Sequence, residues 1–423
     1  MLIQVNTILI ALDRNPSLHV SILIDALRGT REAPKECAAS LLVPLVERFS
    51  DRVDVRFYHT PNFRGLKKRI IPKRFNEGWG LQHIKLYGTD DELILSGANL
   101  SRDYFTNRQD RYHLFKSKEL TNYYARFHEV LRSISYRLVP APDRVERFLL
   151  EWPEDNGCPE PHISPKEYRI HATKLISPLL RPTKTIHTSS AATLVYPISQ
   201  LVPLSEPEID TLATEASGVN YILDMLSQKP FRGGSWVFTA GYFNPSSTVK
   251  AGLIASGNST NGIIINASAE ANGFYGSPNP SGYLPDAYMI LAKRFLQDVR
   301  RAGVQDAIKM EQWRHVPRSR ILDGWTYHAK GIWITPPNHT DPVLTLIGSS
   351  NFTRRSHRLD LESTCVVITR DIALQSALSA EIHHLRKFTE QTDIEDLSEI
   401  LAEGGLRRSL AVKIWVALVG EKL

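Results

Sequence analysis

The chain has 423 residues, of which 42% are hydrophobic and 23% are charged, so it has the composition of an ordinary globular protein and the length for two domains. Its formal net charge of +6 suits a phosphate-bearing partner, namely nucleic acid, a nucleotide or an anionic membrane surface, without choosing among them. Cys37, Cys158 and Cys365 follow no metal-ligand spacing, which favours reduced structural thiols. No apolar run reaches the ~18 residues of a membrane-spanning helix, so none is predicted.

The first 60 residues predict strands alternating with a helix. In chain order the elements are a strand at 19–25, a turn at 27–31, a helix at 32–49 and a strand at 52–58. Apolar residues recur at helical spacing through the helix, which Pro44 would kink, and the second strand alternates like a half-buried one. This order favours an α/β fold in which helices cover a sheet.

A basic stretch, residues 64–74, comes next. It holds six Lys or Arg residues among eleven, interleaved with apolar ones. Two interpretations stay open. The stretch is either a solvated loop or an edge of a site that meets phosphates or anionic lipid heads, where each basic residue contributes ~1 kcal/mol.

The remaining sequence predicts one more helix in the first half and an α/β order in the second. These elements are a helix at 119–138, a Pro-rich connection at 140–218, a helix at 221–226, strands at 235–245 and 262–266, a Gly-, Asn- and Pro-rich loop at 267–285 and a helix at 286–300. Residues 28–31 and 269–273 each follow a strand, at the edge where α/β sheets bind ligands. Residues 406–418 predict a basic amphipathic helix that either packs on the domain or lies in a membrane interface.

Two copies of one short pattern stand out. Each has His-x-Lys on a predicted strand, then an apolar run that ends in small residues and Asn, then Arg and a carboxylate. The members are His83, Lys85, Asn99, Arg102 and Asp110 in the first copy, and His328, Lys330, Asn351, Arg354 and Glu362 in the second. The acidic residue follows its Asn by 11 positions in both copies (99 to 110 and 351 to 362). Such a repeat indicates a duplicated domain.

These residues resemble the phospholipase D superfamily, whose members carry two H-x-K-x4-D motifs that meet in one active site. The first copy fits fully with His83, Lys85 and Asp90, whereas the second has Thr335 in place of the Asp. Within the superfamily the chain is similar to the eukaryotic CDP-diacylglycerol–glycerol-3-phosphate 3-phosphatidyltransferases. The segments that carry this similarity, which runs from about residue 20 to the C-terminus, are 27–31, 96–112, 271–275 and 327–331.

The resemblance implies two similar phospholipase D-like halves, each a mixed β-sheet flanked by helices, with one active site at their interface. The expected halves are residues 1–140 and 219–423, joined by the Pro-rich connection 141–218. Relatives begin well upstream, so the first half is expected to be truncated at its start.

Phosphodiester exchange needs a nucleophile, a proton donor and positive charge around the phosphate oxygens. Histidine fills the first two roles because its pKa of ~6.5 allows both neutral and protonated forms near neutral pH. By resemblance, one His becomes a phosphohistidine while the other protonates the departing group and then deprotonates the incoming hydroxyl. We hypothesise that His83 is the nucleophile, because its motif is intact, and that His328 is the acid and base.

The other pattern residues have supporting roles. Lys85 and Lys330 are expected to hold phosphate oxygens, with help from Asn99 and Asn351. Asp110 and Glu362 are expected to fix the histidine tautomers, as carboxylates do in triads, although spacing does not say which carboxylate serves which His. Asp90, although part of the motif, is expected to be structural. This complement makes a metal or other cofactor unnecessary.

The resemblance implies CDP-diacylglycerol as phosphatidyl donor, CMP as leaving group and sn-glycerol 3-phosphate as acceptor, in the synthesis of phosphatidylglycerol and cardiolipin. For each basic or loop residue assigned here to a substrate, the alternative interpretation is a purely structural role. The candidates are Arg28, Arg31, Arg102, Arg108 and Arg111 for the anionic acceptor, and Asn272, Gly273, Phe274 and Tyr275 for the nucleotide or lipid entrance. Family resemblance further implies peripheral attachment to an anionic membrane, the mitochondrial inner membrane, although no transit peptide is visible.

Three alternatives remain from the sequence. A phosphatidylserine synthase of the same superfamily would take neutral serine. A DNA phosphodiesterase would need a long basic groove with exposed aromatic residues, and no such stripe stands out, so nucleic acid is not expected as a partner. An inactive, truncated membrane-binding form is the non-enzyme alternative, against which the intact His, Lys and Asn residues of both copies argue.

Overall fold

The structure, a computed structural model, describes residues 2–65, 68, 70–71, 73, 76–181, 191–205, 214–278, 280–315, 324–403, 412–414, 416–417 and 420. Much of the basic stretch 64–74 and of the helix expected at 406–418 lies outside the described residues. Within them, no helix is long and apolar enough to cross a membrane.

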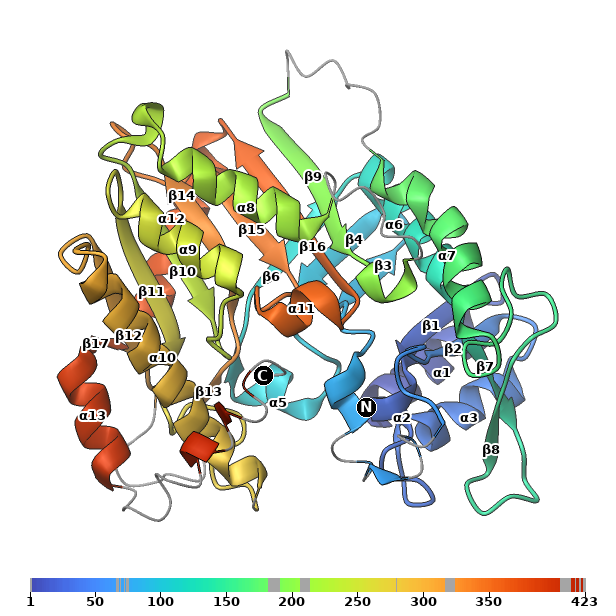
Figure 1. Ribbon diagram of the computed structural model, residues 1–423. Helices are drawn as coiled ribbons and strands as arrows, with labels where there is room; N and C mark the ends of the chain where they lie inside the picture. The colour runs from blue at the N-terminus through green and yellow to red at the C-terminus, as the bar shows by residue number, and fades with distance from the viewer. Residues whose placement is uncertain are drawn as a thin grey trace.

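The first half contains two small sheets (Figure 1). The four-stranded sheet has the order β1 (Val20–Asp25), β2 (Val53–Tyr58), β7 (Tyr136–Pro140) and β8 (Phe148–Glu151). Apolar residues of α1 (Leu2–Arg14) and α3 (Ala38–Arg48) share one core with this sheet. The three-stranded sheet has the order β3 (Leu86–Thr89), β4 (Glu92–Ser96) and β6 (Tyr112–Lys116).

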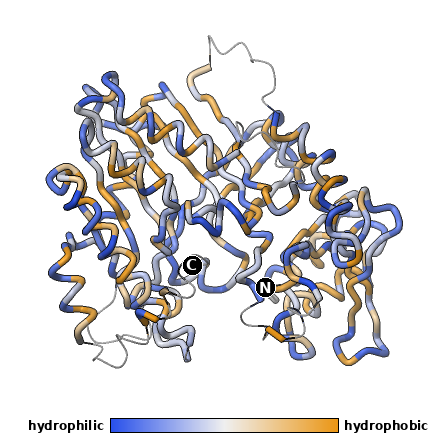
Figure 2. Tube along the Cα trace, in the orientation of Figure 1, coloured by the Kyte–Doolittle hydropathy of each residue, from blue (hydrophilic) through white to orange (hydrophobic). Residues whose placement is uncertain are grey.

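An eight-stranded mixed sheet organises the second half. Its strands lie in the order β17 (Thr389–Gln391), β12 (Ile308–Trp313), β11 (Asn261–Ala267), β10 (Ser235–Ala240), β14 (Lys330–Thr335), β15 (Leu344–Gly348), β16 (Glu362–Thr369) and β9 (Thr193–Gln200). One face packs against α8 (Glu215–Leu226), α9 (Ser247–Ser256), α10 (Leu284–Arg301) and α13 (Ile394–Glu403), and the other against α12 (Ile372–Arg386). Figure 2 shows hydrophobic residues concentrated on these strands.

The two halves share a continuous interface. Helices α6 (Lys118–Arg132) and α7 (Pro165–Leu180) pack in one core with residues of β4, β15 and β16. The short strands β5 (Arg108–Gln109) and β13 (Thr326–Tyr327) pair in parallel across the interface. Three short helices flank the point where the halves meet, namely α2 (Ala26–Gly29), α5 (Arg102–Thr106) and α11 (Arg354–Arg358). The α/β fold expected from the sequence is confirmed.

Three element predictions need correction. The helix expected at 119–138 ends at Arg132, and β7 follows because Tyr136–Pro140 pairs with both β2 and β8. The turn expected at 27–31 is mostly the short helix α2, whose first turn is capped by Asp25 Oδ1 accepting from the Arg28 N–H at 2.9 Å. Helix α3 begins at Ala38 rather than at 32, after a turn that contains Pro34.

The Pro-rich connection is substantially ordered. It supplies β8, helix α7 and β9, and the last of these pairs antiparallel with β16 at the edge of the large sheet. Pro165 occupies the first position of α7, where its missing N–H costs no helical hydrogen bond. The described parts of this connection therefore pack against the two halves.

Candidate active site

Each histidine of the repeated pattern is held by backbone pairing with the opposite half. The His83 N–H donates to the Leu361 carbonyl at 3.0 Å, and the Leu361 N–H donates to the Leu81 carbonyl at 2.8 Å. Likewise, the His328 N–H donates to the Gln109 carbonyl at 2.8 Å. Leu361 and Gln109 each precede a carboxylate of the pattern, so this pairing brings each histidine to the carboxylate of the other copy.

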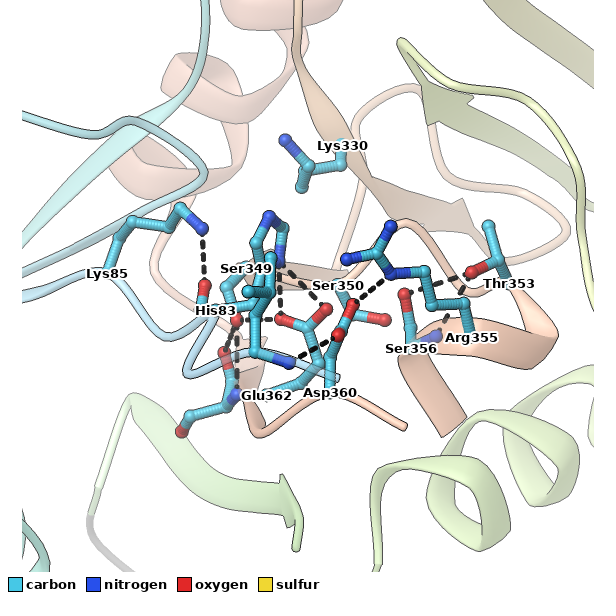
Figure 3. Close-up of polar contacts among 12 residues, drawn as sticks. His83, Lys85, Lys330, Ser349, Ser350, Thr353, Arg355, Ser356, Asp360 and Glu362 are labelled. Carbon is cyan, nitrogen blue, oxygen red and sulfur yellow. Dashed lines mark hydrogen bonds and ion pairs between the residues drawn. The ribbon is translucent and has the colours of Figure 1, made fainter. Parts of the chain in front are cut away.

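The carboxylate pairing is therefore crossed. His83 Nδ1 lies 2.9 and 3.1 Å from the two carboxyl oxygens of Glu362 (Figure 3), and His328 Nδ1 lies 2.7 Å from Asp110 Oδ2. All four side chains are buried. Since an ionised carboxylate accepts the Nδ1 proton, we assign to His328 the tautomer that leaves Nε2 for chemistry, and to His83 the same tautomer in the state with Glu362 ionised.

The two lysines of the pattern lie beside the rings. The ammonium of Lys85 donates to the His83 carbonyl, and that of Lys330 donates to the His328 carbonyl at 2.8 Å. The charge of Lys330 acts on His83 as well as on His328, so the two motifs contribute to one site (Figure 3 shows Lys330 and His83 together). Burial lowers the pKa of both lysines, an effect that nearby carboxylates oppose.

Burial also governs the ionisation of the histidines and their partners. Burial, followed by the Lys330 charge, lowers the pKa of His328 to about 3, and burial with Lys85 and Arg28 lowers that of His83. Burial alone would raise the pKa of Asp110, but Lys330 and His328 together lower it below its ordinary value. In contrast, burial and then the Asp360 charge raise the pKa of Glu362. The acids that contact the two histidines thus have pKa values shifted in opposite directions.

The asparagines and Asp90 differ in placement. Asn99 Nδ2 lies 3.4 Å from the Tyr104 hydroxyl, which lies 3.3 Å from His328 Nε2. Asn351 Oδ1 is buried and has no hydrogen-bond partner among the described residues. Asp90 occupies the exposed turn between β3 and β4, where its φ is 50°, so the structure does not bring it to the histidines.

Basic groups surround both histidines. On the His83 side, Glu77 pairs with Arg28 at 3.0 Å and also with Arg31, while Arg355 donates to Asp360 Oδ2 at 2.9 Å. The charges of Arg28 and Arg355 both act on His83. The charges of Arg28, Arg355 and the two lysines therefore all act on the same buried histidine.

The second basic position lies on the His328 side. Arg108 donates through Nε to Thr326 Oγ1 at 2.9 Å, and its guanidinium lies 4.8 Å from the centre of the Tyr104 ring. The loop that follows β11 approaches it, because a Cβ added to Gly273 would lie 3.3 Å from the Arg108 guanidinium. Asn272 is buried and Phe274 half-buried in this loop, whereas Tyr275 is exposed.

Two predicted substrate-binding arginines are placed elsewhere. Arg111 is fully buried, and its five N–H donors have protein acceptors. These acceptors are both carboxyl oxygens of Glu381, the carbonyls of Lys330 and Leu346, and Thr345 Oγ1. Its expected role in substrate binding is therefore corrected to a structural one beneath the site. Arg102 is exposed at the start of α5.

Comparison with known proteins agrees with this geometry. No protein-family model matches the chain. The CDP-diacylglycerol–glycerol-3-phosphate 3-phosphatidyltransferase of Saccharomyces pastorianus is 44% identical over 98% of this chain and 79% of its own length. The chain belongs to this family. The Schizosaccharomyces pombe enzyme of the same name is 40% identical, over 94% of this chain and 83% of its own length.

More distant relatives extend the comparison. The human family member, named as mitochondrial, is 32% identical over 95% of this chain and 71% of its own length. A crystal structure of phosphatidylserine synthase from Haemophilus influenzae shares the fold, with a TM-score of 0.69 and 21% identity over 98% of this chain and 83% of that chain.

Several residues of this phosphatidyltransferase site escaped the sequence analysis. They are Glu77, Tyr104, Glu215, Tyr242, Ser349, Arg355 and Asp360. Tyr104, Ser349, Arg355 and Asp360 lie within or beside the repeated pattern, but the other copy has Ser356, Gly97, Asp103 and Arg108 at the corresponding positions, so the repeat gives no signal for them. Glu77, Glu215 and Tyr242 come from segments with no repeat signal, so only the fold reveals them.

Three of the buried groups lie close enough to bind a cation together, namely His83, Asp360 and Glu362. Asp360 already accepts hydrogen bonds at both oxygens, from the Leu81 N–H and from Arg355, and His83 Nδ1 faces Glu362. With Lys85 and Arg28 also acting on His83, the surroundings suit an anion better than a metal ion.

The two copies of the repeated pattern differ at Gly97, which lies beside Lys330 and Asp110 in the phosphatidyltransferase site. A Cβ at Gly97 would lie 2.7 Å from Lys330 Nζ and 2.8 Å from Asp110 Oδ1, whereas its counterpart Ser349 hydrogen-bonds Glu362. We expect Gly97→Ala to displace Lys330 and Asp110 and to lower kcat roughly 100-fold with the fold intact. Gly88→Ala, whose Cβ would have ordinary contacts, is the control. Equal rates for both variants would contradict this.

Glu215 is a buried acid whose carboxyl oxygens have no hydrogen-bond partner among the described residues. Its side chain is inaccessible, and Ser350 approaches without completing a hydrogen bond to either carboxyl oxygen. Burial raises the pKa of Glu215 from 4.5 to about 8. The folded state therefore keeps a proton that the unfolded chain releases, so this contribution to stability is present below pH 4.5 and is lost as the pH rises towards 8.

Glu215→Gln removes the titrating carboxyl group and with it the loss of stability as the pH rises towards 8. We expect the melting temperature of the variant to exceed that of the wild type at pH 8 and to approach it at pH 5, because each unit of pKa shift corresponds to about 1.4 kcal/mol. Thermal unfolding at the two pH values, with the exposed Glu119→Gln as control, measures the effect. A difference that does not change between pH 5 and 8 would refute this explanation.

Proposed function

We propose that the chain transfers the phosphatidyl group of CDP-diacylglycerol to sn-glycerol 3-phosphate, giving phosphatidylglycerophosphate and CMP. Its membership of the CDP-diacylglycerol–glycerol-3-phosphate 3-phosphatidyltransferase family is the observation that carries this proposal. The crossed His–carboxylate pairs with two buried lysines are consistent with it, because they supply the groups that phosphodiester exchange requires.

The proposed reaction has two displacements. In the first, His83 Nε2 attacks the phosphorus that bears diacylglycerol, an N–P bond forms, and the P–O bond to CMP breaks. In the second, His328 Nε2 takes the proton of the glycerol 3-phosphate hydroxyl, whose oxygen attacks the same phosphorus and breaks the N–P bond. Lys85, Lys330, Asn99 and Asn351 are proposed to hold the phosphate oxygens.

The surroundings of the two rings support these separate roles. No described residue hydrogen-bonds to Nε2 of His83, so its lone pair is available for attack. Nε2 of His328 instead lies 3.3 Å from the Tyr104 hydroxyl and 3.5 Å from Lys330 Nζ, polar neighbours that suit proton transfer. Crossed pairing also supports the proposal that Glu362 orients the nucleophile and Asp110 the base.

The ionisation of the histidines and lysines explains how substrate binding activates the site. Burial keeps both histidines neutral, the form that a nucleophile and a general base require. The pyrophosphate of CDP-diacylglycerol then brings negative charge beside Lys85 and Lys330, and an adjacent anion raises the pKa of a buried ammonium. Substrate binding therefore favours the charged form of both lysines, whose positive charge stabilises the transition state.

We further propose peripheral attachment to an anionic membrane, at the mitochondrial inner membrane. The net charge of +6 and the mitochondrial names of vertebrate relatives support this location. We also propose that residues 1–140 and 219–423 act as the two halves of one transferase, joined by 141–218, and that neither nucleic acid nor a cofactor takes part.

The function is tested by CMP release from CDP-diacylglycerol in mixed micelles, with glycerol 3-phosphate, with serine, or with neither. We expect rapid release only with glycerol 3-phosphate, and phosphatidylglycerophosphate as the lipid product. Serine-dependent release would instead indicate a phosphatidylserine synthase. Absence of release with either acceptor, from folded protein, would refute the proposed reaction.

A further inference from the structure

The wall around His328 differs from the wall around His83. Rings of Tyr104 and Tyr242 stand edge-on to the His328 imidazole, with centroids 5.2 and 5.5 Å away. Phe274 extends this aromatic group, because its ring centroid lies 5.7 Å from that of Tyr242. Aromatic ring contacts of this kind are recorded for His328 but not for His83 among the described residues.

Arg108 is the basic residue of this wall. Its charge acts on His328, whereas those of Arg28 and Arg355 act on His83. The Arg108 side chain is fixed by Thr326 and by the face of Tyr104, with Asp103 Oδ2 at 3.3 Å. A guanidinium held in this way is preorganised for a phosphate, which it binds through two parallel hydrogen bonds.

The loop after β11 closes the wall. A Cβ on Gly273 would lie 2.9 Å from the Tyr242 hydroxyl and 3.3 Å from Arg108, so the loop backbone is pressed against both. The neighbouring Asn272 is 1% exposed, and its Oδ1 accepts from the Phe274 N–H at 3.0 Å. Asn272 Nδ2 has no partner in the described structure, which leaves a buried donor unsatisfied without a ligand.

The geometry of the reaction determines which substrate groups lie next to the aromatic residues around His328. In an in-line displacement the attacking and leaving atoms lie on opposite sides of phosphorus. If His83 attacks, CMP departs on the His328 side. The second displacement breaks the N–P bond along the same line, so the hydroxyl of glycerol 3-phosphate must enter from the side that CMP has left.

We propose that CMP and glycerol 3-phosphate bind in turn to one subsite on the His328 side, formed by Arg108, Tyr104, Tyr242 and Asn272. This inference rests on the proposed function and on His83 as nucleophile. Arg108 is proposed to bind the phosphate of each molecule, that of CMP next to the reacting phosphorus and that of glycerol 3-phosphate at the far end of the glycerol backbone, while the tyrosines and the Asn272 amide meet the cytidine. CMP and glycerol 3-phosphate therefore compete for this subsite. Glycerol, which has no phosphate for Arg108 to bind, is expected to be a poor acceptor.

The test compares arginines on the two sides of the histidine pair. CMP binding is measured by titration calorimetry without lipid, and the KM for glycerol 3-phosphate by CMP release. We expect Arg108→Gln to raise both the Kd for CMP and the KM for the acceptor at least ~10-fold, and Arg108→Lys to recover part of each. Arg28→Gln is expected to raise the Kd for CMP less than Arg108→Gln does, and the exposed Arg126→Gln on α6 is expected to leave it unchanged.

The outcomes separate this subsite from the reaction itself. If Arg28→Gln weakens CMP binding and Arg108→Gln does not, the subsite proposal is overturned while acceptor-dependent turnover by the wild type still supports the function. If CMP binding depends on Arg108 but the wild type shows no turnover, the subsite is supported and the proposed reaction fails. CMP inhibition that is not competitive with glycerol 3-phosphate would also overturn the shared subsite.

Discussion

His83→Ala is expected to abolish both CMP release and phosphatidylglycerophosphate formation, with a loss of at least ~10³-fold, because no other group can form the N–P bond. His328→Ala is expected to lose transfer to a similar extent but to retain a burst of up to one CMP per protein molecule, because the covalent intermediate then accumulates. A phosphate with a second pKa near ~6 departs with little help from an acid, whereas an alcohol needs a base. Rates with matched amounts of folded protein check both expectations.

The matched control is His339→Ala, an exposed histidine in the loop after β14, which should keep wild-type rates. Full activity of either active-site variant would show that the two-histidine mechanism is wrong. If His328→Ala lost CMP release completely and His83→Ala retained it, the roles of the two residues would be reversed.

Asp110→Asn is expected to lower kcat by roughly 10³-fold to 10⁴-fold, with a much smaller change in KM. Its carboxylate lies 2.7 Å from His328 Nδ1 and holds the proton there, and an amide that donates to Nδ1 instead would place the proton on Nε2 and remove the base. The pKa of Asp110 is lowered by Lys330 and His328 despite burial, so the wild-type carboxylate is ionised throughout the working pH range.

Glu362→Gln should have a comparable effect through His83, because the crossed pairing gives each histidine its own carboxylate. The exposed Asp143→Asn serves as control. If Asp110→Asn impaired the first displacement, measured as CMP release, more than the second, the assignment of Asp110 to the base would be wrong.

The sequence alone predicts which residues meet but not how they pair. The two His-x-Lys patterns, with Asn and a carboxylate at matching distances, predict one joint site and an α/β fold, and the fold is confirmed. The crossing of Glu362 to His83 depends on backbone hydrogen bonds between Leu361 and residues 81 and 83, some 279 positions away. Local spacing carries no information on such contacts.

The wrong predictions concern residues whose placement depends on contacts with distant parts of the chain. From the sequence, Arg111 is a candidate for the anionic acceptor because that acceptor needs extra positive groups, yet Glu381 on α12 and carbonyls of β14 and β15 accept its hydrogen bonds. Residues 133–138 continue a helical apolar pattern, but Tyr136–Pro140 gains more by filling the space between β2 and β8. In both cases long-range packing overrides the local signal.

We propose that a covalent phosphatidyl-histidine forms before the acceptor binds, and isotope exchange between CMP and CDP-diacylglycerol detects this intermediate. Labelled CMP is incubated with CDP-diacylglycerol and the wild-type protein without glycerol 3-phosphate, and the label in the lipid is followed. A two-step mechanism predicts that label enters CDP-diacylglycerol, and that His83→Ala abolishes this exchange. No exchange, from protein that transfers rapidly once glycerol 3-phosphate is added, would contradict the covalent mechanism.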